Sequence, residues 1–480
     1  MENTRVIRGT EELARGELDN VTLDEGGVVL DQADGDYLAY GCYTTPALRL
    51  PAFDRLLVSW NADTPPGTVV EVQARVLQSG KWSNWRGFGR WSPWMNRWGV
   101  WQQPGEGIFV RGGTMVLPEG APGSCAQLRA YLYTEDDKQT PTLRLLAASV
   151  RPTKPDGREN RPLNRELRIP AYSMQNRGVG LPGSIAGPTA LASLMNRWGQ
   201  DILPEELAHL SRDCDCDSPS GYNLAFLGAA AGSLGFSAWQ AWLDMNGLRD
   251  ALRGEHGVLA AVRPGLLYTP PEPEPEPAGP DAPAGENAAE AEPAPAPQPP
   301  SPTDEEIAAM PASHRVVVRG MTTDQRGQAW VMLNDPAAPD DEAARIQVPV
   351  ERFLQAWEGR CLIVDHKFRH GGKHGPQRMG CQLVPAEGRE EPAEDGSTLW
   401  QMVQGGKPCP MPAERHSLMY TRPEELPRAT TAHKRFYHDA ALEDGLIRLP
   451  AQVTEKGSRV TLYCVDGNGC MRVADHVFCA

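Results

Sequence analysis

A long proline-rich stretch limits what this chain can fold into. Residues 269–306, TPPEPEPEPAGPDAPAGENAAEAEPAPAPQPPSPTDEE, contain no large apolar side chain, so they cannot contribute to a hydrophobic core. We expect a solvated, semi-extended segment there. Because apolar strand patterns occur on both sides of it, the stretch is predicted to interrupt one domain rather than to join two.

The rest of the chain has the composition of a globular protein. Its 480 residues exceed what one core supports, and about three domains are expected. A net charge of −15 without a basic stripe argues against a nucleic-acid partner. The N-terminus lacks an apolar signal segment and no apolar run is long enough to span a membrane. Ten cysteines without an export signal are expected to be reduced, which favours a cytoplasmic protein.

The pattern of elements predicts a multidomain α+β protein. An N-terminal arm (1–26) precedes a predicted β-sandwich (27–152), in which short β-branched and aromatic segments alternate with turn signals. Residues 165–366 combine helical and strand patterns and are expected to form an α+β domain around the 269–306 insert. Residues 367–480 are expected to be β-rich, with an irregular first half and three strands near the end.

Within 165–366, apolar periodicity places each element. The ranges 187–198, 204–210, 223–231 and 245–252 have the helical period, and 258–262, 315–320, 329–333 and 361–364 are apolar strand candidates.

Tryptophan is concentrated in the first block. Seven of the thirteen tryptophans are Trp60 and those of KWSNWRGFGRWSPWMNRWGVW. An aromatic face of this kind could stack sugars or prolines, but core and edge packing is the favoured interpretation because tryptophan buries a large area.

The stretch GSIAGPTALASLMNRWG, residues 183–199, carries the main functional signal. A cysteine peptidase needs a thiolate at a helix N-terminus, a histidine to move the proton, an acid or amide to orient that histidine, and an oxyanion donor. Further along the chain, the strand pair SHRVVVRG and WVMLNDPAA supplies a histidine and an acid.

These stretches, with SWNADTPPGTVVEVQARV, KWSNWRGFGRW, RIPAYSMQ and FLQAWEGRCLIV, resemble the bacteriocin-processing, double-glycine leader peptidases. The resemblance is to the subgroup with an N-terminal β-sandwich, and it runs from about residue 25 to residue 366. It implies a papain-like α+β fold and peptide-bond hydrolysis on a peptide or small-protein substrate, without a cofactor.

The resemblance assigns roles to individual positions. The nucleophile's place is Ala186, the proton-shuttling histidine is His314, the orienting acid is Asp335 and the oxyanion glutamine is Gln175. Residues expected to line the substrate cleft are Gly187, Tyr222, Asn223 and Asn334. Taken singly, a histidine before a strand or an Asn-Asp-Pro turn is common, and their shared order carries the assignment.

Alanine at position 186 has no thiol and cannot attack a carbonyl group, so the chain as written is expected to be inactive. The alanine is either a deliberate change from cysteine or a natural feature of a pseudopeptidase that still binds peptides. Ser184 precedes the helix and is not expected to act as the nucleophile in place of a cysteine. Two hypotheses remain open: a cysteine peptidase lacking its nucleophile, and a non-catalytic peptide-binding scaffold.

Metal binding is not expected. Cys214 and Cys216 lie in an acidic loop, and the histidines of HKFRHGGKH lack the paired cysteines of a structural zinc site. Isolated cysteines such as Cys464, Cys470 and Cys479 are more often small buried apolar residues.

Overall fold

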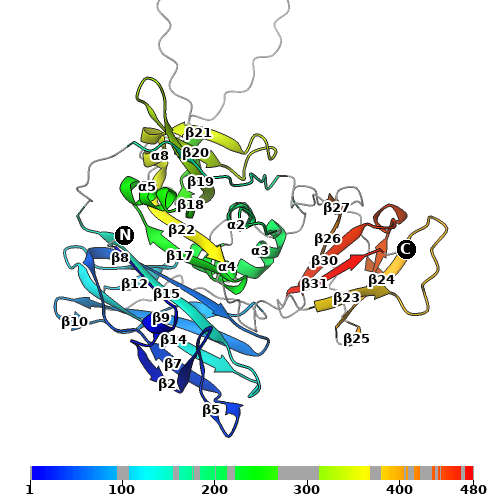
Figure 1. Ribbon diagram of the computed structural model, residues 1–480, viewed down its shortest axis with the longest axis horizontal. Coiled ribbons are helices and arrows are strands. Elements are labelled where there is room, and N and C mark those ends of the chain that lie inside the picture. Colours follow the sequence, from blue (N-terminus) through cyan, green and yellow to red (C-terminus); the bar gives the residue numbers. More distant parts are fainter. Residues whose placement is uncertain are drawn as a thin grey trace, which may run out of the picture.

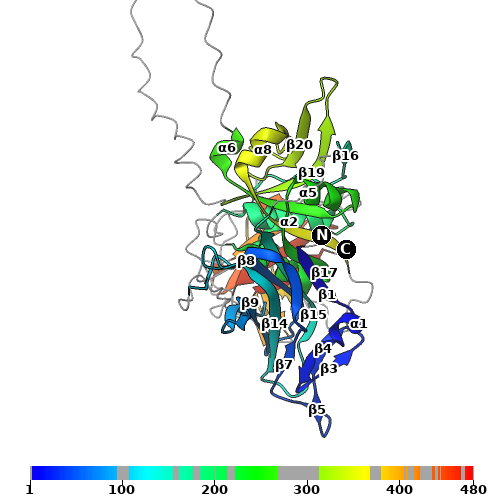
Figure 2. The ribbon, with the colours of Figure 1, turned by 90° about the vertical axis from the view of Figure 1, so that its left-hand side faces the viewer.

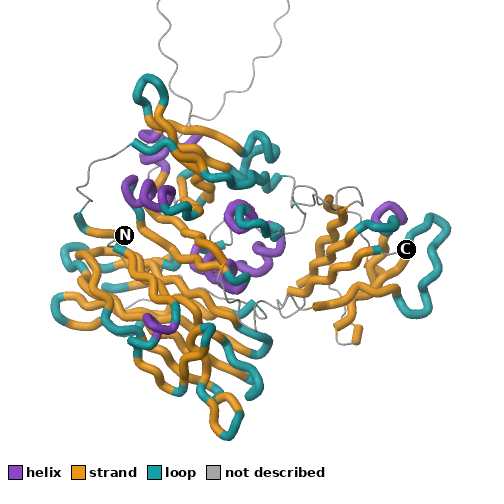
Figure 3. The backbone as a smooth tube through the Cα atoms, viewed as in Figure 1, coloured by secondary structure: helices purple, strands orange, loops and turns teal. Residues whose placement is uncertain are grey.

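The chain folds into three β-rich bodies (Figure 1). The computed structural model describes residues 3–93, 107–154, 162–175, 177, 184–200, 202–212, 222–268, 313–367, 380–404, 407–408, 416–421, 435–437, 442–443, 445–465 and 471–478. Their large sheets have 13, 7 and 9 strands, and the helices gather in the middle body (Figure 3). The protein is therefore multidomain and mostly β, and the 269–306 insert lies outside the described residues.

The first body, here the β-domain, consists of two layers joined by one long strand. Strand β8 pairs through its first residues with β14 and through its second half with β15. In β9 the residues at even positions 70–76 are buried and those between them are half-exposed, as expected for a strand with one face on a core. The strands are β1 (Thr4–Arg8), β2 (Glu17–Asp19), β3 (Val21–Asp24), β4 (Gly27–Leu30), β7 (Tyr40–Thr44), β8 (Leu48–Asp63), β9 (Thr68–Gln78), β10 (Lys81–Trp82), β11 (Arg86–Trp91), β12 (Phe109–Arg111), β13 (Thr114–Val116), β14 (Gly123–Thr134) and β15 (Thr142–Pro152). A helical turn, α1 (Thr10–Leu13), and a small hairpin, β5 (Gln32–Ala33) with β6 (Asp36–Tyr37), complete it.

The predicted N-terminal arm belongs to this β-domain. Strand β1 pairs with β15 from Thr4 opposite Ser149 to Arg8 opposite Leu145, and β3 pairs with β4. The domain therefore begins at residue 4 rather than at residue 27. These early strands are too short for an alternating pattern to distinguish them from a polar arm. Their pairing with other strands defines them, and the sequence pattern does not show that pairing.

The second body carries the predicted helices on a seven-stranded sheet in the order β17-β22-β18-β19-β20-β21, with β16 beside β19. The helices are α2 (Ala186–Asn196), α3 (Pro204–Ser211), α4 (Leu224–Ser233), α5 (Met245–Arg253), α6 (Pro264–Tyr268) and α8 (Val350–Ala356). The strands are β16 (Arg165–Glu166), β17 (Phe236–Trp242), β18 (Gly257–Val262), β19 (His314–Thr323), β20 (Ala329–Asn334), β21 (Arg345–Pro349) and β22 (Trp357–Lys367). The four predicted helices and four predicted strands are present within a few residues of their expected bounds.

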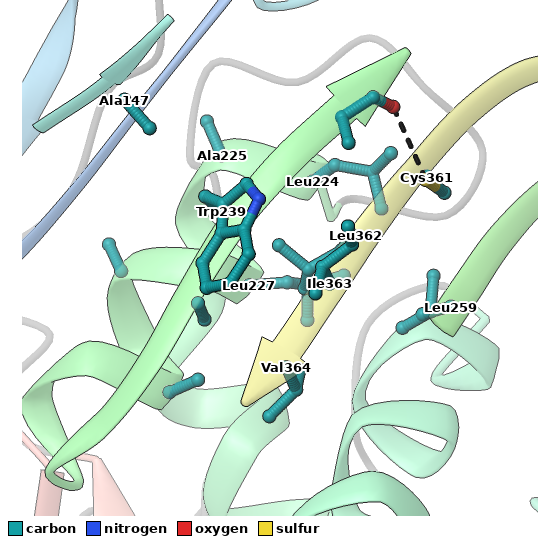
Figure 4. Packing of buried hydrophobic residues seen from close by; sticks show 14 of the residues in the cluster. Ala147, Leu224, Ala225, Leu227, Trp239, Leu259, Cys361, Leu362, Ile363 and Val364 are labelled. Atoms are coloured by element: carbon teal, nitrogen blue, oxygen red, sulfur yellow. Dashed lines mark hydrogen bonds between the residues drawn. The ribbon is translucent and has the colours of Figure 1, made fainter. Parts of the chain in front are cut away.

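Strand β17 was not predicted, and it connects the two bodies. Its sequence FSAWQAW is buried at nearly every position, so it lacks the alternation of a half-exposed strand. It packs with β22 and α4 in one core, with Ala147 of β15 nearby (Figure 4). In the view of Figure 2, β1, β15 and β17 lie together.

The free edge of β17 is satisfied by side chains of the β-domain. Asn61 accepts the Ala238 N–H at 2.9 Å and donates to the Ala238 carbonyl at 2.9 Å. Ser59 accepts the Gln240 N–H at 2.8 Å, and Ser149 accepts the Trp242 N–H at 2.9 Å. Asn3 donates to the Trp242 carbonyl at 2.6 Å. Side chains of the β-domain thus substitute for a neighbouring strand along an edge that would otherwise leave buried backbone groups unpaired.

The third body is a nine-stranded sheet with its own core. Strands β23, β24 and β26 lie in the part expected to be irregular, so more of it is regular than predicted. The three strands predicted near the end are β29, β30 and β31. Its strands are β23 (Gly380–Pro385), β24 (Thr398–Gln404), β25 (Lys407–Pro408), β26 (His416–Thr421), β27 (Arg435–Tyr437), β28 (Leu442–Glu443), β29 (Leu446–Leu449), β30 (Arg459–Val465) and β31 (Met471–Val477), with a 3-10 turn at Ala451–Val453.

No helix in the described ranges is long and apolar enough to cross a membrane.

Candidate active site

A buried histidine–carboxylate pair lies where strands β19 and β20 meet. The strands are antiparallel, so the start of β19 at His314 lies near the end of β20 at Asn334. The His314 Nε2 and Asp335 Oδ1 atoms are 2.6 Å apart, and the two side chains are 9 % and 5 % exposed. The structure therefore brings together the predicted proton shuttle and its predicted orienting acid.

Burial disfavours the charged form of both side chains. It lowers the pKa of His314 to about 4, with a further contribution from the neighbouring positive charge of Arg315. Burial also raises the pKa of Asp335, against the effect of the Ala337 N–H, which donates to Oδ1 at 2.8 Å. We assign a neutral imidazole that donates from Nε2–H to the Asp335 carboxylate, which leaves the Nδ1 lone pair free to accept a proton.

Ala186 is the first residue of helix α2, which packs against β19. Its side chain is 3 % exposed, and no side chain caps this end of the helix. The first N–H groups of a helix have no partner within the helix, and its dipole favours negative charge there. Pro188 has no N–H, so Ala186 and Gly187 supply the donors of this first turn.

Gly187 allows the helix to lie close to its neighbours. A Cβ atom at this position would be 3.0 Å from Cδ1 of Leu227 and 3.6 Å from Cγ of Arg315, the residue after His314. The start of α2 is therefore packed directly against the strand segment that carries the histidine.

Gln175 lies in a segment that connects the other parts of the site. The N–H of the preceding residue, Met174, donates to the Pro336 carbonyl at 2.7 Å. Ser184, which leads into α2, donates from Oγ to the Met174 sulfur at 3.5 Å. Through these two hydrogen bonds, the segment contacts both the turn that follows Asp335 and the residues that lead into α2 at Ala186. Gln175 is exposed, and its backbone N–H donates to Oγ of Ser173 at 3.0 Å.

The predicted cleft residues are held by the protein itself. Asn334 is 1 % exposed and donates to the Pro170 carbonyl at 3.1 Å, while its Oδ1 has no partner among the described residues. Tyr222 packs with Ile185, just before α2. Asn223 caps α4 by accepting the Phe226 N–H at 2.8 Å. Substrate contact by these residues stays a prediction.

One residue of the site was not singled out from the sequence. Arg315 is 8 % exposed, and its Nη1 donates to the His314 carbonyl at 3.0 Å. It fixes the backbone of the histidine and adds positive charge beside the imidazole. The only feature of the sequence that points to Arg315 is its position directly after His314. Nothing in the stretch HRVVVRG distinguishes a buried arginine from an exposed one.

Most residues considered for metal binding lie outside the described part of the chain: Cys214, Cys216, His370, His374, Cys470 and Cys479.

Comparison with known proteins relates the β-domain to a domain found in peptidases. Residues 3–150 match the family model of the Peptidase C39 N-terminal domain. This range coincides with the β-domain, including the β1 strand that the sequence had placed in an arm. No curated protein matches the chain. The match supports a relationship to C39-type peptidases through the β-domain, and the residues of the site lie beyond it.

Proposed function

We propose that residues 165–366 form a papain-like domain of the cysteine-peptidase type in which Ala186 occupies the nucleophile's position. The observation that carries this proposal is the buried 2.6 Å contact between His314 and Asp335 at the start of β19, the strand on which α2 packs. A buried imidazole with one nitrogen held by a carboxylate and the other free is what general-base catalysis requires.

With a cysteine at position 186, each remaining group has a defined task. His314 Nδ1 takes the thiol proton, and the thiolate sulfur attacks the carbonyl carbon of the scissile peptide bond. The Gln175 amide and backbone N–H groups at the start of α2 stabilise the oxyanion. His314 then returns its proton to the departing amine as the C–N bond breaks, and water hydrolyses the thioester.

With alanine at this position the chain holds a peptide without forming a bond to it. Ser184 does not replace the missing thiol, because it precedes the helix and its hydroxyl hydrogen-bonds to the Met174 sulfur. A peptide or small protein is the proposed ligand, and the cytoplasm the proposed location.

A second candidate function is a non-catalytic peptide-binding scaffold. The methyl group of Ala186 favours it, since such a side chain permits peptide binding while excluding covalent chemistry. In that case the natural residue at position 186 is alanine, whereas the enzyme hypothesis requires cysteine there.

Thiol labelling separates the two candidates. Ala186→Cys and the parent chain are treated with iodoacetamide at neutral pH and followed by intact mass. The half-exposed Cys42 and Cys125 serve as internal references. We expect the introduced thiol to react at least about tenfold faster than these references, and His314→Ala in the same background to abolish the excess. Equal rates would overturn the enzyme proposal and leave the scaffold.

A further inference from the structure

A stack of alternating aromatic rings and arginines covers the outer face of the β-domain. The Arg75 guanidinium lies 4.9 Å from the ring centroid of Trp82 and 4.7 Å from that of Trp85. The Arg129 guanidinium lies 4.2 Å from the Trp85 centroid and 5.0 Å from that of Tyr131. Tyr133 stacks on Tyr131 with centroids 6.1 Å apart. We call this set the arginine ladder; its Trp82 and Trp85 are half-exposed and so lie outside the buried core.

The two arginines are fixed by neutral partners. Arg75 donates from Nε and Nη2 to Oε1 of Gln127, which lies opposite it in the β9–β14 register. Arg129 makes the same pair of hydrogen bonds to Gln73, again its direct partner in the register. Each guanidinium therefore has its Nη1 donors left over, held in a defined orientation by two hydrogen bonds and two rings.

The positive charge of the arginine ladder is not neutralised by a described carboxylate. No ion pair joins Arg75 or Arg129 to any acid among the described residues. The nearby Glu71 is engaged by Arg90 at 2.7 Å and accepts from Gln73 at 2.8 Å. Two unpaired arginines on one sheet face of a protein with a net charge of −15 form an oriented site for an anionic partner.

The packing of the rings favours carboxylates over a stacked sugar. A glycan that binds to tryptophan needs an open ring face, but guanidinium groups already lie against Trp82, Trp85 and Tyr131. What the arginine ladder presents outward is N–H donors, which recognise acidic oxygens.

We propose that the arginine ladder docks an extended acidic peptide segment of another protein, with carboxylates at alternate positions. Both guanidinium carbons lie within 4.7 Å of the Trp85 centroid, so at most about three residues of extended chain separate them. Residues two apart in an extended peptide point to the same side, so one carboxylate reaches each arginine. Tyr131, Tyr133 and the 58 % exposed Tyr40, which is paired with Tyr133, continue the face as an apolar surface.

This docking leaves the candidate active site open. The arginine ladder lies on β9, β14 and the segment from β10 to β11, whereas the second body packs mainly against β8 and β15. The proposal therefore does not depend on the identity of residue 186.

Fluorescence anisotropy on the full chain tests the proposal. The probes are a labelled peptide with glutamates alternating with threonine, its glutamine counterpart, and an oligogalacturonate of similar charge. We expect the glutamate peptide to bind best, with an affinity that falls as salt rises. The double variant Arg75→Gln/Arg129→Gln is expected to lose about tenfold or more in affinity, while Arg326→Gln, an exposed arginine outside the ladder, changes nothing.

The variant Arg75→Lys/Arg129→Lys keeps both charges but not the planar fork, and it is expected to recover only part of the binding. Circular dichroism reports whether the glutamine variant folds. If it does not, the lysine variant takes its place in the comparison with the parent chain. Equal affinity of all chains, a preference for the oligogalacturonate, or no binding of the glutamate peptide by the parent chain would each overturn the proposal and leave the arginine ladder as a structural element.

Discussion

His314 is buried at the start of β19, and its environment changes its titration. The folded chain binds a proton at this imidazole only near pH 4, the pKa that burial gives it, whereas an unfolded chain does so near the ordinary histidine pKa of 6.5. The stabilising contribution of the neutral form is therefore complete above pH 6.5 and is lost as the pH falls toward 4. Imidazole NMR signals, assigned with His314→Gln, are expected to show no protonation of His314 above about pH 5. A midpoint near 6.5 would show that the imidazole is not buried beside Arg315.

At the residue scale, the His314–Asp335 pair was expected from the family resemblance, which assigns a role to each residue, and the antiparallel pairing of β19 with β20 explains how the two residues meet. The sequence does not predict Arg315, whose burial depends on the close approach of α2. The resemblance also places Asn334 in the cleft, which stays a prediction; in the structure its amide nitrogen donates to the Pro170 carbonyl. Polar side chains that serve the backbone cannot be distinguished from ligand-binding ones by residue type alone.

At the scale of elements, Asn61 substitutes for a strand partner of β17. Its side chain exchanges two hydrogen bonds with Ala238 and also donates to the Gly228 carbonyl of α4 at 3.3 Å. Asn61→Ala leaves these buried backbone groups unsatisfied and is expected to lower the free energy of unfolding by roughly 2 to 4 kcal/mol. Urea unfolding measures this, with the exposed Gln32→Ala as a control expected to change little. An equal effect of both variants would show that the edge of β17 is satisfied in another way.

Helix α5 shows why four helices of the second body could be predicted: its buried residues Met245, Leu248 and Leu252 recur with the helical period, and Asp244 caps its start by accepting the Gly247 N–H. Strand β17 was not predicted, because an edge strand buried on both faces resembles any short apolar run. Strand β17 is defined by its contact with the β-domain. The side chains that accept its N–H groups belong to Ser59, Asn61 and Ser149, which lie more than ninety residues away in the chain.

At the scale of the whole molecule, the first two bodies share one hydrophobic core, and the third has its own. We therefore expect native-state hydrogen exchange to give β15 and β17 the same opening free energy. The amides of Ala238, Gln240 and Trp242 are the reporters, since the β-domain side chains accept their N–H groups. Strand β30 of the third body is expected to open independently. Exchange of β17 at a lower free energy than β15 would mean that the two bodies unfold separately.

The proposed function rests on Ala186 facing a working histidine–carboxylate pair, and the pH dependence of thiol alkylation tests that most directly. The rate for Ala186→Cys is measured between about pH 4 and pH 9, alone and with His314→Ala. We predict that the introduced thiol reacts at pH values well below the ordinary cysteine pKa of about 8.5, because a thiolate at position 186 stabilises the His314 imidazolium that burial disfavours in the alanine chain. Removing His314 is predicted to shift the profile back toward about 8.5. A midpoint near 8.5 in both chains would contradict a poised site at the start of α2.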